Sequence, residues 1–138
     1  MVVGLVLLLC ACGRARTTDV VVGRITFHVQ IAATEALREH GLMGVRALPS
    51  DHGMLFLWDA VAVRRFYMKD TLIPLDLISI RGDRVVGVAT MTPCKKDPCP
   101  ITVTPPANAA LEVQAGAAKR AGIASGAKIT SPALPVAD

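Results

Sequence analysis

Lys69, Asp70, Thr71 and Asp76 bring an amine, two carboxyl groups and a hydroxyl group into a span of eight residues. Groups of this kind can transfer a proton, and a lysine whose pKa is lowered in a pocket can attack a substrate. Alternate residues of an extended strand point to the same side, so Lys69 and Thr71 would share one face with Tyr67. These residues define one hypothesis, a small hydrolase-like enzyme that uses Lys69, Asp70 and Asp76.

A structural role for Asp76 is the competing interpretation, and we favour it over ligand binding and catalysis. Apolar residues follow Asp76, so its carboxyl group would be half-buried and would need a partner such as Lys69 or Arg38 together with backbone donors. The sequence has neither a Ser-His-Asp arrangement nor a nucleophile elbow. We therefore lean towards a protein without catalytic activity.

Aromatic residues indicate a second kind of site. All five aromatic side chains lie between residues 27 and 67, where they would either form the core of one sheet or border a groove. Trp58 and Tyr67 each combine a flat face with a polar group, which suits a sugar, a peptide or another ligand with an apolar face. The nearby arginines that could select an anionic ligand are Arg46, Arg64 and Arg65. The candidate ligand-binding residues are Trp58, Tyr67, Lys69, Thr71 and Glu112.

Cys94 and Cys99 enclose the four residues Lys-Lys-Asp-Pro. In an oxidising compartment, two cysteines at this spacing can form a disulfide that stabilises the fold by about 2 kcal/mol. One alternative is half of a zinc site, for which the chain offers the imidazoles of His28, His40 and His52. Another is a redox-active pair. We predict a disulfide and no metal site.

Four methionines suggest a copper-binding protein of the cell envelope as a further alternative, because thioether sulfur binds Cu(I). They are Met43, Met54, Met68 and Met91. Methionine also fills gaps in apolar cores, and here it would replace aromatic bulk. We expect core packing for these residues and no bound cofactor.

The first twelve residues, MVVGLVLLLCAC, are uncharged and almost wholly apolar. As a helix they would span about 18 Å, which is short of the hydrocarbon thickness of a bilayer, so they suit a secretory signal better than a membrane anchor. The segment ends in a lipobox-like sequence at Cys12, which would carry the lipid after cleavage. Alternatives are cleavage without lipidation and an N-terminal strand. We predict that residues 1–12 are a signal peptide and residues 13–19 a polar tether.

The rest of the chain reads as short strands with two small helices. Thr34 can cap a helix that ends at Gly41, and residues 117–121 make a second helical turn. Residues 92–107 are rich in proline and predict an irregular segment, and residues 132–138 a frayed tail. The expected strands are Val20–Ala33, Met54–Trp58, Arg65–Lys69, Leu75–Ile80, Arg84–Met91, Ala110–Gln114 and Lys128–Thr130. We predict one α+β, mainly β domain over residues 20–131, with a compact barrel-like or curled antiparallel sheet.

Composition limits the class of protein. A chain of 138 residues that is 52% hydrophobic is long enough for one folded domain and too apolar to be disordered. Its formal net charge is +4, which is weak evidence for nucleic acid. We predict no nucleic-acid partner.

Four segments carry a resemblance to a known family. They are Gly41–Met43 (GLM), Leu48–Phe56 (LPSDHGMLF), Phe66–Asp76 (FYMKDTLIPLD) and Ala110–Gly116 (ALEVQAG), the last followed by Gly122 and Ile123. Over roughly residues 25–130 they resemble the domain of unknown function 192 family, described as uncharacterised ACR. The family usually has Trp at the position of Tyr67 and Asn at that of Asp70. The resemblance implies a lipoprotein or secretory signal before the domain and assigns no activity.

These observations favour an exported bacterial envelope protein, anchored by a lipid on Cys12 and facing the periplasm or the cell exterior. The expected partners are the membrane, through that lipid, and a small ligand or an envelope protein. A ligand- or partner-binding module is the favoured function, and the hydrolase-like enzyme and the copper-binding protein are the alternatives.

Overall fold

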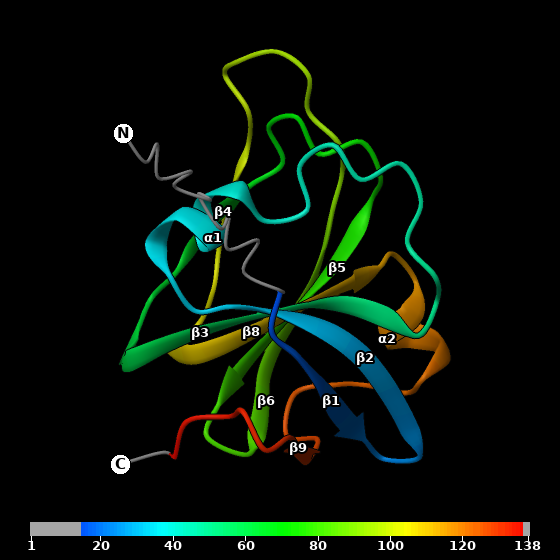
Figure 1. Ribbon diagram of the computed structural model, residues 1–138, viewed down its shortest axis with the longest axis vertical. Helices are drawn as coiled ribbons and strands as arrows, with labels where there is room; N and C mark the ends of the chain where they lie inside the picture. Colours follow the sequence, from blue (N-terminus) through cyan, green and yellow to red (C-terminus); the bar gives the residue numbers. More distant parts are fainter. Residues whose placement is uncertain (1–14, 137–138) are drawn as a thin grey trace, which may run out of the picture.

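The computed structural model describes residues 15–136, which form a curled seven-stranded sheet, a two-stranded sheet and two short helices (Figure 1). Cys12 and the rest of the predicted signal peptide lie outside the described residues. The strands are β1 (Thr17–Val22), β2 (Ile25–Ala32), β3 (His52–Ala62), β4 (Arg65–Tyr67), β5 (Leu75–Arg81), β6 (Arg84–Met91), β7 (Ile101–Val103), β8 (Ala107–Gln114) and β9 (Ile129–Thr130). The helices are α1 (Glu35–His40) and α2 (Ala117–Arg120).

The large sheet has the strand order β6-β5-β8-β3-β2-β1-β9 and curls into a half-barrel, which confirms the predicted mainly β, curled architecture. All neighbouring pairs in it are antiparallel except β2 and β3. These two are parallel because the chain between them crosses over through α1 and a long loop. No helix in the described part of the chain is both long enough and apolar enough to cross a membrane.

The first predicted strand is wrong in its bounds. The chain reverses at Gly23, whose φ of 61° suits glycine, and forms the hairpin of β1 and β2 in place of one strand over residues 20–33. Thr17, Thr18 and Asp19 were expected in the tether but lie in β1, where they are paired with Gln30, Val29 and His28 in that order. The folded domain therefore begins at residue 17.

Apolar side chains form two cores on opposite faces of the sheet. The α2-side core contains Phe27, Leu55, Ile78 and Leu111 together with Ala117 and Ala118 of α2. The α1-side core contains Phe56, Met54, Met68, Leu75, Leu77 and Met91, and Trp58 and Phe66 pack against it. The aromatic residues are thus divided between two faces and do not form a single core. Three of the four methionines are buried among apolar side chains.

Both helices begin where the sequence predicts. The Thr34 hydroxyl accepts a hydrogen bond from Leu37 N, and α1 ends at Gly41, whose N–H donates to Leu37 O. Residues after α1 then lead the chain over the α1-side core, to which Leu42 contributes. The helix is consequently held over one face of the sheet (Figure 1).

The proline-rich segment is more regular than predicted, because β7 within it pairs with β4. Cys94 and Cys99 form the expected disulfide, with 5.8 Å between their Cα atoms. The predicted frayed tail is also more ordered than expected, since Ala133 and Leu134 pack against the α2-side core.

Candidate functional site

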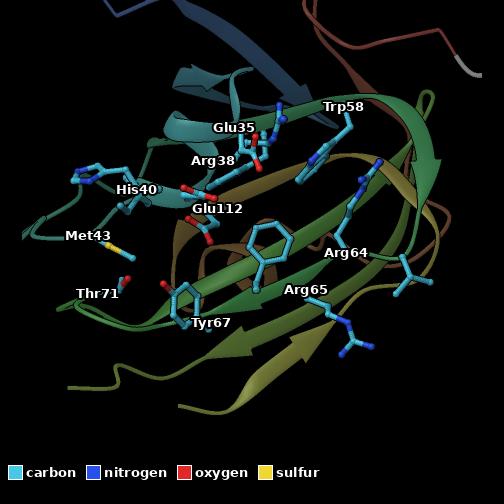
Figure 2. Close-up of a pocket in the computed structure, with 16 residues that line it drawn as sticks. Glu35, Arg38, His40, Met43, Trp58, Arg64, Arg65, Tyr67, Thr71 and Glu112 are labelled. Carbon is cyan, nitrogen blue, oxygen red and sulfur yellow. The ribbon is translucent and has the colours of Figure 1, made fainter. Parts of the chain in front are cut away.

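A pocket of about 640 Å³ opens between α1 and the strands β3, β4 and β8 (Figure 2). Its wall is mixed: aromatic rings, arginines and carboxyl groups all contribute to it. Four of the five candidate ligand-binding residues line it, namely Trp58, Tyr67, Thr71 and Glu112. They come from segments far apart in the sequence, and the sheet topology brings them together.

Glu112 is the most unusual residue of this pocket. It lies on β8, between Met54 of β3 and Leu77 of β5 in the strand register, and only 5% of it is exposed. Among residues 15–136 its side chain accepts no hydrogen bond and forms no ion pair. Every completely buried side-chain oxygen of these residues has a hydrogen-bond partner, so the unpartnered carboxyl oxygens of Glu112 must be accessible from the pocket. Burial raises the pKa of Glu112 to about 8.

Backbone packing fixes the place of this carboxyl group. Gly53 of β3 lies opposite Val113, and a Cβ atom at Gly53 would clash with the carbonyl oxygen of Glu112. Glycine therefore permits β3 and β8 to approach closely at this point. Along β8, Leu111 and Val113 point to the α2-side core, so Glu112 points to the opposite face, where the pocket lies.

Two arginines flank Trp58 in the same pocket. The guanidinium carbon of Arg64 lies 4.5 Å from the Trp58 ring centroid and that of Arg38 lies 5.6 Å from it. Arg38 Nη1 also donates to the carbonyl oxygens of Ala33 (2.8 Å) and Leu57 (2.9 Å). Burial, and then the charge of Arg38, lower the pKa of Arg64. Both arginines are therefore held beside Trp58, and among residues 15–136 neither forms an ion pair with Glu112.

Packed aromatic rings form one wall of the pocket, next to the arginines. The Phe66 ring packs edge-on against both Phe56 and Trp58, with centroid distances of 5.3 Å and 6.1 Å. Tyr67 stands at the rim and is 46% exposed. Figure 2 shows Glu112, Tyr67 and Thr71 towards one end of the pocket and Trp58 and Arg64 towards the other. The site thus has a polar end and an aromatic end.

Lys69 is the candidate ligand-binding residue that does not line the pocket. Its Nζ lies 2.8 Å from Asp97 Oδ2, in the loop closed by the disulfide. The hydrogen bond to Asp97 is the main cause that raises the pKa of Lys69 and lowers that of Asp97. The predicted strand over residues 65–69 ends at Tyr67, and Asp70 has a φ of 55° in the following turn. The expected alternation of faces along residues 67–71 is therefore wrong.

Asp76 is 2% exposed and so more deeply buried than predicted. A backbone N–H donates to it, as predicted, whereas the side chains of Lys69 and Arg38 do not bond to it. Its Oδ1 accepts a hydrogen bond from Thr90 Oγ1 (2.7 Å), and its Oδ2 accepts one from Ala118 N of α2 (3.0 Å). Arg38 and Lys69 are engaged elsewhere. The three residues of the hydrolase hypothesis thus have separate surroundings: Lys69 in an ion pair, Asp70 in a turn and Asp76 beneath α2.

Sequence reasoning missed several lining residues. It treated Arg38 only as a partner for Asp76, and Phe56 and Phe66 only as core residues. The one available signal for Arg38 was its place on the helix that follows Thr34, because that helix covers the open face of the sheet.

A second hollow of about 840 Å³ lies beside the first and is lined by β1, β2 and the segment after α1. His28 and His52 line it and are held by Asp19 and Asp51 at 2.7 Å and 2.8 Å. Between residues 15 and 136, no three side chains of His, Cys, Asp or Glu are grouped so that they could hold a metal ion. The titratable groups lining this hollow are all exposed, unlike Glu112.

Comparison with known proteins places this chain in a family. The family model described as DUF192, Uncharacterized ACR, matches residues 17–131. The chain belongs to the DUF192 family. The match begins at the first residue of β1, in agreement with the start of the folded domain.

Two solved structures resemble this DUF192 chain. A Sinorhizobium meliloti 1021 protein, provisionally described as a transcription regulator, is 28% identical with a TM-score of 0.80, and the alignment covers 87% of this chain and 97% of that one. A Novosphingobium aromaticivorans DSM 12444 protein of unknown function is 32% identical with a TM-score of 0.74, and the alignment covers 84% of each chain. No curated protein matches the sequence.

Proposed function

We propose that this DUF192 protein is a small-ligand-binding module whose site is the pocket beneath α1. The observation that carries the proposal is Glu112, a carboxyl group that is more than nine-tenths buried, has no partner among residues 15–136 and faces the pocket. Burying such a group without a hydrogen bond is unfavourable, and a ligand that bonds to it recovers part of that cost. Unsatisfied polar groups of this kind are typical of binding sites.

Binding is tested by NMR titration of the labelled protein with a mixture of small metabolites, together with native mass spectrometry of the freshly isolated protein. We expect a saturable ligand whose chemical-shift changes are confined to amides around Trp58, Tyr67 and Glu112. Glu112→Gln should abolish or strongly weaken binding, while Asp83→Asn, in an exposed hairpin turn, should leave it unchanged. Equal binding by wild type and Glu112→Gln, or no saturable binding by the wild type, would contradict the proposal.

We also propose that the module is exported and held at a bacterial membrane by a lipid on Cys12. The support is the apolar segment and lipobox-like ending of residues 1–12, together with the Cys94–Cys99 disulfide, a bond that persists in oxidising compartments. Metabolic labelling with a fatty acid should mark the wild type and not Cys12→Ser. Equal labelling of the two would remove the lipid anchor from the proposal.

A further inference from the structure

We infer that the pocket beneath α1 takes a small amphoteric ligand, whose ammonium group pairs with Glu112 and whose anionic group pairs with the arginines that flank Trp58. The inference rests on the proposed function and names the class of ligand. It follows from the charges on the pocket wall and from which of them already have partners.

The ammonium half follows from the surroundings of Glu112. The pocket also contains arginines, but across residues 15–136 none of them forms an ion pair with Glu112; Arg38 is bonded to two backbone carbonyls and Arg64 lies on the Trp58 ring. Lys69, the other cation of this region, is paired with Asp97. Since the described part of the chain supplies no cation to Glu112, a ligand that carries one would both satisfy the carboxylate and favour its ionised form.

The anionic half follows from the arginines. Arg38, Arg64 and Arg65 line the pocket, and across residues 15–136 none of them forms an ion pair with a carboxyl group. A ligand with a positive charge alone would be repelled by these guanidinium groups. A second, negative group on the same ligand turns that repulsion into attraction, and a guanidinium group is well suited to bind a carboxylate or a phosphate.

Glu112 and the arginines beside Trp58 lie towards different ends of the pocket, so we expect the ligand to carry an apolar spacer between its two charged groups. Figure 2 places Glu112 and Tyr67 near one end of the pocket and Trp58 with Arg64 near the other. The rings of Phe56 and Phe66 line the same pocket and pack against Trp58. An alkyl chain that lies against these rings would keep its two charged groups apart. A pocket of about 640 Å³ has room for a molecule of this size.

Proton release should accompany binding. Glu112 carries its proton at neutral pH because burial raises its pKa to about 8, and an ammonium group beside it lowers that pKa again. The proton then passes to the solvent, and the ammonium group stays charged. The other titratable groups that line the pocket are the half-buried Arg38 and Arg64 and the exposed Glu35, Glu39, His40, Arg65 and Tyr67.

Matched probes of one length test this inference: 6-aminohexanoate, hexylamine and hexanoate, each titrated calorimetrically against the full folded domain. 4-Aminobutanoate and 8-aminooctanoate extend the series in both directions. We expect one of the amino acids to bind at least about tenfold more tightly than hexylamine or hexanoate. Its affinity should rise between pH 6 and pH 8, by up to about tenfold per pH unit for one linked proton.

Variants assign the two ends of the ligand. Glu112→Gln, which keeps the shape of the side chain, should remove the preference for the amino acid over hexanoate and also the rise with pH. Arg64→Met should remove the preference for the amino acid over hexylamine, with far-UV circular dichroism as the check on folding. A probe series in which hexanoate or hexylamine binds as tightly as the amino acids, or in which none binds, overturns the inference.

The proposed function fails separately from this inference. If the metabolite titration yields a pocket ligand that Glu112→Gln loses, but that ligand has no ammonium group or binds more weakly as the pH rises towards 8, the pocket remains a binding site and the amphoteric class is wrong. If the wild type binds neither the metabolite mixture nor any probe, both are wrong.

Discussion

Asp76 and Glu112 are two buried carboxyl groups on neighbouring strands, and they face opposite sides of the same sheet. In the register of β5 and β8, Asp76 lies opposite Val113 and Leu77 lies opposite Glu112. Asp76 is 2% exposed and accepts hydrogen bonds from Thr90 and from the backbone of α2. Glu112 is 5% exposed, and its side chain faces the pocket.

The difference shows how covering elements decide the role of a buried acid. Beneath α2, the backbone N–H of Ala118 donates a hydrogen bond to Asp76, so this carboxyl group links the helix to the sheet. Beneath α1, no backbone N–H of residues 15–136 donates to Glu112, and a cavity lies between α1 and the sheet. The first carboxyl group therefore supports the fold, and the second is available to a ligand.

The largest expected effect is a pH-dependent change in stability that distinguishes Glu112 from Asp76. The pKa of Glu112 is raised from 4.5 to about 8, so the folded state holds this proton more strongly than the unfolded state does. Its contribution is fully favourable below pH 4.5 and is lost as the pH rises towards 8. At pH 9, Glu112→Gln should therefore be more stable than the wild type by about 5 kcal/mol, from a shift of this size.

Urea unfolding of both proteins at pH 5 and pH 9 measures this difference. Near pH 5 the two should be similar in stability, since Glu112 is protonated when folded. A Glu112→Gln variant that is less stable than the wild type at pH 9 would mean that Glu112 has a partner in the folded protein, and the contrast with Asp76 would disappear.

Asp76→Ala should lower the stability of the protein, which is the opposite of the change expected for Glu112→Gln at pH 9. The substitution leaves the Ala118 N–H and the Thr90 hydroxyl without their acceptor, which costs about 3 kcal/mol of unfolding free energy for two hydrogen bonds to a charged group. The urea midpoint gives the loss, and Asp76→Asn, which can still accept one of the bonds, should lose less. If Asp76→Ala unfolds at the wild-type midpoint, Asp76 does not support the fold in the way described.

Removing the disulfide tests the Glu112 face of the sheet more than the Asp76 face, because Cys94 packs against the α1-side core. The double variant Cys94→Ser/Cys99→Ser should lose about 2 kcal/mol of stability by the chain-entropy estimate for a short loop. Hydrogen exchange should then be faster at the N–H of Asp70, which donates to the carbonyl oxygen of residue 94, and at the N–H of residue 94, which donates to Met68 O. Exchange at Ala118, beneath which Asp76 lies, should stay as slow as before.

The smallest expected effect concerns Lys69. Its ion pair with Asp97 is at the surface, so Lys69→Ala should shift the urea midpoint only slightly, and less at high salt. In a double-mutant cycle with Asp76→Ala the two changes should be additive, because Lys69 and Asp76 share no partner. A measurable coupling energy would restore the Lys69–Asp76 pair that the sequence suggests.

Local sequence patterns predicted the secondary-structure elements well, but they predicted the tertiary partners of individual side chains poorly. The Thr34 cap and the Cys94–Cys99 disulfide are short-range features, and the structure confirms both. The partner of Asp76 depends on α2, which follows 41 positions later in the chain, and neighbouring residues carry no sign of it.

The candidate site was predicted in part for the same reason. Trp58, Tyr67, Thr71 and Glu112 were selected by residue type and by family motif, and they line one pocket. Lys69 was selected with them on the assumption of a continuous strand, but the turn at Asp70 ends that strand and directs Lys69 to the disulfide loop. The absence of a counter-charge for Glu112 could not be read from the sequence, because it depends on where Arg38 and Arg64 are held.

The early start of β1 sets how far the domain could stand from a membrane. Only residues 13–16 separate Cys12 from Thr17, and a fully extended link from Cys12 to Thr17 spans roughly 17 Å. That is little more than half the hydrocarbon thickness of a bilayer, about 30 Å. With a lipid on Cys12, the hollow lined by Thr17, Thr18 and Asp19 would lie close to the headgroups, and the neighbouring pocket of Glu112 would sample molecules held in that surface layer.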